Sequence, residues 1–163
     1  MKELIEEATQ LTTNLCKHFE GLSLNAYICP AGVPTIGYGS THHLTGEKVK
    51  IGDAAITESM ANLYLATEIK GFMQATLRLC PVLVNHEPHR LAAITDFAFN
   101  CGSGRLKSST LRRTVNSEDW QESSVQLQRW IWGGGRKLPG LIRRRRAESN
   151  LLLGITLDKY RGS

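Results

Sequence analysis

The chain of 163 residues (18.1 kDa) fits one folded domain, because 41% hydrophobic and 21% charged residues exclude a disordered or collagen-like protein. It has no run of about 18 apolar residues and acids interrupt its first segment, so we predict neither a membrane-spanning helix nor a signal peptide. The net charge of +5 is uneven, since residues 101–163 hold 13 Lys and Arg against 5 Asp and Glu, whereas residues 1–100 hold 7 against 10. The basic part favours polyanionic partners, and the charge alone does not choose among them.

The four cysteines are too irregularly spaced for a metal site. No two of them form a CxxC pair, and none stands in a Cys/His cluster of the kind that zinc needs. They are Cys16, Cys29, Cys80 and Cys101. We therefore predict no metal, and thiols that stay reduced where the protein is made.

The first third of the chain predicts one helix and a small sheet. Apolar residues recur at spacings of three and four over residues 2–19, which is typical of an amphipathic helix, and Gly21 offers a stop. Between residues 22 and 45 the pattern changes to short β-prone segments, 25–28 and 35–39, broken by prolines and glycines. We predict a β-hairpin sheet there.

The rest of the chain predicts helices. Thr57 can cap a long helix that continues to Leu79, with Pro81 just beyond its end, and its length suits a connection between two lobes. Four shorter helices are predicted after it, at residues 88–99, 109–115, 117–132 and 141–153. Ser117 would cap the third of them, and a glycine-rich turn at 133–140 precedes the last.

Two groups of side chains in the helical part have structural interpretations. Trp120, Trp130 and Trp132 are expected to pack between helices. Residues 143–146 are four successive arginines, which cannot all face one way on a helix that turns about 100° per residue. We expect two or three of them in solvent and one facing the protein, and we predict no nucleic-acid binding.

The segment that begins at Glu20 contains the candidate catalytic residues. Cys29 follows Glu20 after eight residues, Thr35 follows after five more, and Gly37-Tyr38-Gly39 comes next. Cleavage of a glycosidic bond needs an acid beside the leaving oxygen and a second group on the other side of the sugar. The segment resembles the catalytic segment of phage-type lysozymes, glycoside hydrolase family 24, whose pattern is Glu, eight residues, Asp or Cys, five residues, Thr.

The resemblance continues into the helical part. Motifs in the family's order occur at residues 97–102, 109–111, 129–130, 134–141 and 144–148. The similarity therefore covers most of the chain from Phe19 to Leu153, and several independent motifs in the same order make a chance match improbable.

The fold that this resemblance implies is α+β and lysozyme-like. A small β-hairpin sheet lobe and a larger helical lobe would be joined by a long helix, with the active-site cleft between them. All 163 residues would form one lysozyme domain. We place the sheet lobe at about 21–56 and the helical lobe at about 1–20 plus 57–163.

The function that the resemblance implies is hydrolysis of β-1,4 bonds between N-acetylmuramic acid and N-acetylglucosamine in bacterial peptidoglycan. Glu20 would be the general acid, Cys29 would help the attack at the anomeric carbon, and Thr35 would position Cys29 or the catalytic water. Asn100 either lines the sugar site or caps a helix end. No cofactor is required.

Two positions depart from the commoner family pattern. Many relatives have His after Gly-Tyr-Gly, where this chain has Ser40, followed shortly by His42 and His43, which we expect to be exposed loop residues. The commoner residue at the position of Cys29 is Asp. A thiol with a pKa of about 8.5 is mostly protonated at neutral pH, so Cys29 is a poor base unless the site lowers its pKa.

Two other functions stay open at this point. A lytic transglycosylase needs only a single acid/base Glu, because the sugar's own hydroxyl displaces the leaving group. A non-catalytic peptidoglycan-binding pseudoenzyme could have lost its second carboxylate. The retention of Glu20 and Thr35 in register argues against the pseudoenzyme.

The resemblance to endolysins also implies partners and a location. Peptidoglycan would be the partner of a monomer that does not insert stably into membranes. Because the first residues lack the anchor that some relatives carry, we expect accumulation in the host cytoplasm. The enzyme would reach the periplasm or cell wall when a separate pore-forming protein, a holin, opens the membrane.

Overall fold

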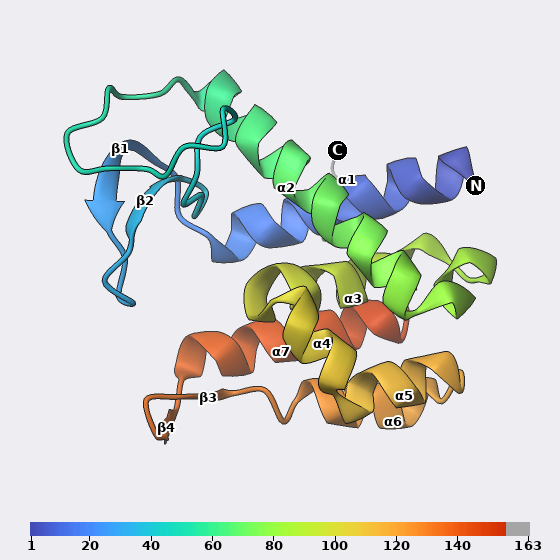
Figure 1. Ribbon diagram of the computed structural model, residues 1–163. Coiled ribbons are helices and arrows are strands. Elements are labelled where there is room, and N and C mark those ends of the chain that lie inside the picture. Colours follow the sequence, from blue (N-terminus) through green and yellow to red (C-terminus); the bar gives the residue numbers. More distant parts are fainter. Residues whose placement is uncertain (156–163) are drawn as a thin grey trace. The chain divides into compact units, whose positions relative to one another are not determined.

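The computed structural model describes residues 1–155, which form helices and two small antiparallel sheets (Figure 1). Contacts within the chain define two compact units. The sheet unit is Cys16–Glu68, and the helical unit consists of Met1–Leu15 together with the described residues from Ile69 onward. The mixed α+β composition predicted from the sequence is confirmed.

Helix α1 (Lys2–Phe19) is the amphipathic helix that the sequence predicts. Ala8, Leu11 and Leu15 are at most 1% exposed, and their spacing of three and four residues places them on one face. The acids near its start, including Glu3, are exposed. The periodic apolar positions therefore anchor this helix to the protein core.

Strands β1 (Ser23–Ile28) and β2 (Pro34–Gly37) form the hairpin of the sheet unit. Tyr27 lies opposite Thr35 in this antiparallel pair, and a bulge interrupts the register nearer the start of β1. Three of the four β2 residues are buried, whereas β1 is mostly exposed. The β2 strand thus lies against the core of the unit, whose buried apolar residues include Ile36, Val49, Ile56, Ala61, Tyr64 and Leu65.

Helix α2 (Glu58–Leu79) begins where the sequence predicts, because Thr57 caps it. The N–H of Met60 donates to Thr57 Oγ1 at 3.1 Å, which satisfies one of the unpaired donors of the first turn. Beyond its end, Pro81 starts the 3-10 helix η1 (Pro81–Asn85). The residues of α2 belong partly to the sheet unit and partly to the helical unit.

Replacing Thr57 with alanine should reduce the free energy of unfolding by about 1 kcal/mol, because the Met60 N–H loses its acceptor. Urea unfolding of purified protein, followed by circular dichroism, measures this change. Thr57→Ser is the matched control because serine keeps the capping oxygen. Equal stability of the alanine and serine variants would refute the capping role.

Seven helical and strand elements follow η1 in the described part of the helical unit (Figure 1). They are α3 (Pro88–Cys101), then α4 (Ser103–Ser108), α5 (Thr110–Asn116), α6 (Trp120–Leu127), β3 (Trp132–Gly133), β4 (Arg136–Lys137) and α7 (Pro139–Leu152). Every residue from 91 to 98 in α3 is buried. A helix that is buried all round belongs at the centre of a domain, and α3 packs against α4 and α7.

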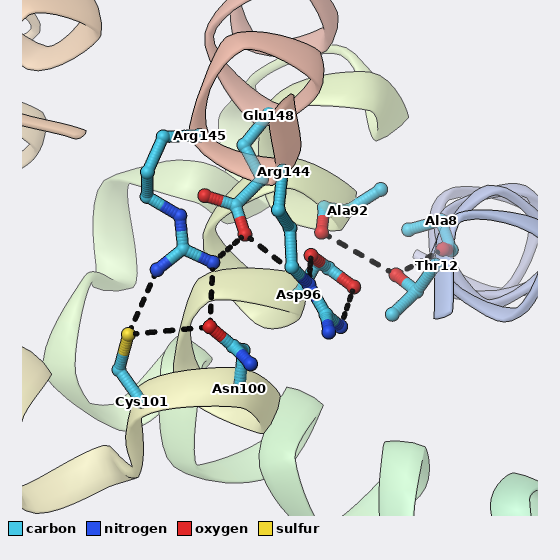
Figure 2. A network of polar contacts seen from close by, with 9 residues as sticks. All are labelled: Ala8, Thr12, Ala92, Asp96, Asn100, Cys101, Arg144, Arg145 and Glu148. Carbon is cyan, nitrogen blue, oxygen red and sulfur yellow. Dashed lines mark hydrogen bonds and ion pairs between the residues drawn. The ribbon is translucent and has the colours of Figure 1, made fainter. Parts of the chain in front are cut away.

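Two of the four successive arginines are buried between α7 and α3 (Figure 2). Arg144 donates from Nε and Nη2 to the two carboxylate oxygens of Asp96, both at 2.9 Å. Arg145 Nη2 lies 2.6 Å from Glu148 Oε1. These pairs satisfy charges whose unpaired burial would be costly. Residues 143 and 146 are exposed, so two arginines are in solvent as expected, but two and not one face the protein.

The predicted helix over residues 117–132 is wrong at both ends. Glu118 has a φ of +58°, a left-handed conformation that prevents a helix from starting at Ser117. Asp119 is the N-cap of α6 instead, since its Oδ1 accepts the N–H of Glu122 at 3.0 Å. The helix ends at Leu127.

Trp132 is the one predicted packing tryptophan that the fold places in solvent. It is 59% exposed and belongs to β3. Gly134 and Gly135 both have positive φ, +57° and +76°, which allows the two-residue turn that pairs β3 with β4. Trp130, by contrast, packs edge-on against Phe97 with ring centroids 5.2 Å apart, as predicted.

Three further findings concern residues 1–155. Every helix there is too short or too polar to span a bilayer. No three His, Cys, Asp or Glu side chains in this part of the chain are grouped so that they could hold a metal ion. The four cysteines all lie among these described residues, and none of them is in a disulfide.

Candidate active site

Glu20 directly follows α1 and lies in the sheet unit. Its N–H donates to the carbonyl of Cys16 at 2.7 Å, so the last helical turn fixes its backbone. Its side chain is half-buried and approaches the turn after β2, where a Cβ added to Gly39 would lie 3.5 Å from Glu20 Oε2. Gly39 has a φ of +100°, which L residues rarely adopt. The glycine therefore lets the backbone pass close to this carboxyl group.

Cys29 lies at the start of the turn that joins β1 to β2. The N–H of Gly32 donates to the Cys29 carbonyl at 2.8 Å, and the Cys29 N–H donates to the Val33 carbonyl at 3.0 Å. Pro30 supplies a fixed φ within this turn, and Gly32 supplies a φ of +78°. The local sequence thus holds Cys29 in a defined turn and leaves its side chain half-buried.

The surroundings of Cys29 lower the pKa of its thiol below the ordinary value. The main cause is a hydrogen bond from the backbone N–H of Val33 to the sulfur, and partial burial acts in the opposite direction. The N–H of Ala31 and the hydroxyl of Thr35 lower the pKa further. These contacts therefore raise the fraction of thiolate, the nucleophilic form of cysteine, above that of an ordinary thiol.

Thr35 lies on β2 with only 3% of its surface exposed. Its Oγ1 donates to the Val33 carbonyl at 2.9 Å and is also in hydrogen-bond contact with Cys29. Because a hydroxyl has one hydrogen and two lone pairs, Thr35 can accept the S–H of the thiol while it donates to Val33, or it can turn its hydrogen to the thiolate in place of that carbonyl. The hairpin thus couples the two side chains that the sequence motif separates by five residues.

Tyr27 is a further residue of this region that the sequence did not single out. Burial raises the pKa of its phenol, and the negative charges of Glu20 and Cys29 raise it further. Both acidic groups therefore lie within electrostatic range of one ring. The available sequence signal was an aromatic residue two positions before Cys29 in a predicted strand, where alternation places both side chains on one face.

The prediction that both histidines of the loop after β2 are exposed is wrong for one of them. His42 is exposed as expected, but His43 is half-buried. His43 Nε2 lies 2.8 Å from Asp53 Oδ2, and its Nδ1 lies 3.0 Å from the hydroxyl of Tyr64. The loop packs on α2 through the contact with Tyr64, and the contact with Asp53 holds the ring within the loop, which is why His43 is not a solvated loop residue. The strong hydrogen bond from His43 lowers the pKa of Asp53.

Asn100 lies in the helical unit, in the last turn of α3. Its Oδ1 accepts a hydrogen bond from Arg145 Nη2 at 2.8 Å (Figure 2), a contact to α7 that sequence spacing could not reveal. Asn100 also lines a pocket of about 350 Å³ in this unit. The other lining residues are Cys101, Arg105, Arg129, Trp130, Trp132 and Leu141.

The motif geometry agrees with a family match over most of the chain. Residues 17–148 match the family described as Phage lysozyme. The chain belongs to the phage lysozyme family. This match includes Glu20, Cys29, Thr35 and Asn100, the four residues that the sequence suggested for the site.

Individual relatives of this phage lysozyme family member are endolysins. The endolysin of Acyrthosiphon pisum secondary endosymbiont phage 1 is 37% identical over 142 residues, which cover 84% of this chain and 91% of the relative. The endolysin of Bacillus phage B103 is 35% identical over 89% of this chain, which spans 53% of that longer protein. The solved endolysin from Escherichia coli O157:H7 phage FAHEc1 has a TM-score of 0.78 and 31% identity, with 88% of this chain and 90% of that chain covered.

These matches confirm three predictions made from the sequence. The family is that of phage-type lysozymes, the fold is lysozyme-like and α+β, and the function is that of a peptidoglycan-hydrolysing endolysin. The enzyme class is accordingly a lysozyme-type glycosidase. The transglycosylase and pseudoenzyme alternatives are not favoured.

Proposed function

We propose that the enzyme is an N-acetylmuramidase that hydrolyses the β-1,4 bond between N-acetylmuramic acid and N-acetylglucosamine. The observation that carries this proposal is the hydrogen-bonded turn around Cys29, which provides a second reactive group at the family position after Glu20. An acid and a second group together meet the chemical demand of glycosidic hydrolysis.

Glu20 acts as the general acid in this proposal. It donates its proton to the glycosidic oxygen as the bond to the anomeric carbon breaks, so the leaving sugar departs as a neutral alcohol. The half-burial of Glu20 and the backbone packed against it at Gly39 support a carboxyl group with a restricted position. A restricted acid is better aligned with the leaving oxygen than a freely rotating one.

Cys29 acts at the anomeric carbon, as a thiolate that attacks it directly or assists the attacking water. The Val33 N–H stabilises this thiolate, and Thr35 orients either the sulfur or the water through its hydroxyl. Asn100 contributes to substrate binding in the helical unit. Its place on the wall of a pocket with two tryptophans and two arginines supports that role.

Digestion of purified peptidoglycan should release muropeptides with ordinary reducing muramic acid ends, because water is the final acceptor in a hydrolase. Mass spectrometry of the products identifies these ends. Products with anhydromuramic ends, each one water lighter, would show a transglycosylase. New reducing ends on N-acetylglucosamine would show the wrong bond specificity.

The proposed partner and location follow from the same activity. We expect a monomer that stays in the host cytoplasm until a holin opens the membrane, then reaches peptidoglycan. Support comes from α1, whose apolar face packs into the folded core through Ala8, Leu11 and Leu15 and so is occupied within the protein.

Expression of the chain in the bacterial cytoplasm should leave cells intact until the inner membrane is permeabilised. Culture turbidity should then fall within minutes of adding chloroform or inducing a holin, since the wall becomes accessible. A Glu20→Gln strain treated in the same way provides the control for chloroform alone. Spontaneous lysis before permeabilisation would contradict this dependence on a pore.

A further inference from the structure

A buried arginine holds the side chain of Asn100 by its oxygen (Figure 2). Arg145 is 0% exposed, and its Nη2 donates to Asn100 Oδ1 at 2.8 Å. The same Nη2 donates to Glu148 Oε1 at 2.6 Å, and Glu148 is also 0% exposed. Because one rigid guanidinium group makes both contacts, Glu148 fixes the arginine that holds Asn100.

Cys101 contacts the same oxygen of Asn100. Its Sγ donates to Oδ1 at 3.7 Å, and Arg145 Nη1 donates to Sγ at 2.8 Å. Burial raises the pKa of the Cys101 thiol above its ordinary value, so the sulfur keeps the proton that it donates. An amide oxygen has two lone pairs, and the two donors therefore engage both of them.

These contacts determine which way the Asn100 amide is turned. An arginine has five N–H donors and no acceptor, so it can hold the amide oxygen but not the amide nitrogen. Figure 2 shows Oδ1 on the side of Arg145 and Cys101, with Nδ2 directed away from them. What Asn100 can offer to a ligand is consequently the pair of hydrogens on Nδ2.

The pocket that Asn100 lines is built from donors of the same kind. Four other lining side chains have nitrogen atoms that donate hydrogen bonds and accept none: Arg105, Arg129, Trp130 and Trp132. Among the described residues that line this pocket, Asn100 alone has a side-chain oxygen, and Arg145 engages that oxygen. The pocket therefore matches a ligand group that accepts hydrogen bonds.

We propose that Arg145 is a positioning residue of this pocket, which holds Asn100 Oδ1 so that Nδ2 donates to an acceptor oxygen of the peptidoglycan, in a carbonyl or carboxylate group. This inference rests on the proposed role of Asn100 in substrate binding. Because Arg145 is 0% exposed, it acts on the substrate through Asn100 and does not touch it. Its effect should appear in KM, with kcat largely unchanged.

The test measures kcat and KM on solubilised peptidoglycan for Asn100→Ala, Asn100→Asp, Arg145→Lys and Arg145→Gln. Arg146→Gln is the matched control, because Arg146 is an exposed arginine at the next position of α7. Thermal unfolding of each variant shows that the folded enzyme is being assayed. Asn100→Asp keeps the test decisive if the Arg145 variants do not fold, since its carboxylate still accepts from Arg145 but has no hydrogen to donate.

We expect Asn100→Ala to raise KM by about 3-fold to 10-fold, the loss typical of one hydrogen bond. Asn100→Asp should raise KM at least as much, because a carboxylate repels an acceptor oxygen. Arg145→Gln should also raise KM, since glutamine both donates and accepts and no longer fixes the amide, whereas lysine only donates and should stay closer to the wild type. All variants should keep kcat within about twofold.

A raised KM in Asn100→Ala together with a wild-type KM in Asn100→Asp would overturn the inference, because the oxygen would then suffice. An Arg145→Gln enzyme that unfolds more easily but keeps the wild-type KM would show a structural role alone. A wild-type KM in Asn100→Ala would remove Asn100 from substrate binding, and the inference with it. The muramidase activity is judged separately, by the sugar ends of the products.

A second substrate distinguishes the two sources of the acceptor oxygen. Coupling of the peptidoglycan carboxyl groups to methylamine removes their charge. If this treatment raises KM for the wild type but not for Asn100→Ala, the acceptor is a carboxylate. If it changes neither KM while Asn100→Ala and Asn100→Asp still bind weakly, the acceptor is a carbonyl oxygen.

Discussion

Replacing Glu20 with glutamine should leave a folded protein that has lost nearly all lytic activity. Glutamine has almost the same shape, so the half-buried position at the end of α1 is preserved. It cannot donate a proton to the leaving oxygen, and general acid catalysis is typically worth about 10²–10⁴-fold in rate. The initial rate at which a suspension of purified cell walls clears measures the loss.

Glu3→Gln is a suitable control, since Glu3 is an exposed carboxylate on α1, the helix that Glu20 directly follows. It should clear walls at the wild-type rate. Circular dichroism and thermal unfolding should give similar curves for both variants and the wild type. A Glu20→Gln enzyme that clears walls almost as fast as the Glu3→Gln control would remove Glu20 from the acid role.

Replacing Cys29 with alanine should lower activity severely without a matching loss of thermal stability. The thiol is half-buried in a turn that the backbone holds through Gly32 and Val33, so the fold does not depend on the sulfur. The reaction does depend on it if Cys29 acts at the anomeric carbon. Cys29→Asp should stay active, because aspartate is the commoner residue at this family position.

The pH dependence of these enzymes provides an independent readout. The pKa of Cys29 is lowered, chiefly by the Val33 N–H, so the thiolate persists to lower pH than an ordinary thiol and is lost as pH falls through that lowered value. A carboxylate at the same place is protonated only near pH 4. The wild type should therefore lose activity at a higher pH than Cys29→Asp on the acidic side of the profile.

Thiol alkylation distinguishes Cys29 from the other cysteines. Cys16 and Cys80 are buried, whereas Cys101 is half-buried and could also react. Iodoacetamide should inhibit the wild type and leave Cys29→Asp active. Equal inhibition of both enzymes would trace the effect to Cys101. A Cys29→Ala enzyme as fast as the wild type would show that Glu20 works without Cys29.

Elements with strong local signals were predictable from the sequence. The spacing of Ala8, Leu11 and Leu15 identified α1, and Thr57 marked the start of α2. Both signals act within a few residues, through an apolar face and a capping oxygen. Helix α6 was misplaced because the left-handed backbone of Glu118 competes with the capping signal of Ser117.

In the candidate site, too, some features were predictable from the sequence and others were not. Glu20, Cys29 and Thr35 were found by their spacing, and the turn residues Pro30 and Gly32 already indicated a hairpin between the last two. The contact of His43 with Tyr64 joins segments distant in the chain. Such contacts depend on how the loop packs against α2, which no local pattern encodes.

The sequence by itself determined the order of the main elements, because turn, cap and periodicity signals act over short distances. Its resemblance to a known motif indicated the family and the three motif residues. Only the tertiary structure decided which charges are buried and what they contact. Arg144 and Arg145 are adjacent to solvated arginines in a uniform basic run, yet they lie inside because Asp96 and Glu148 meet them there. Burial of a charge requires a partner in space, and partners in space are set by packing.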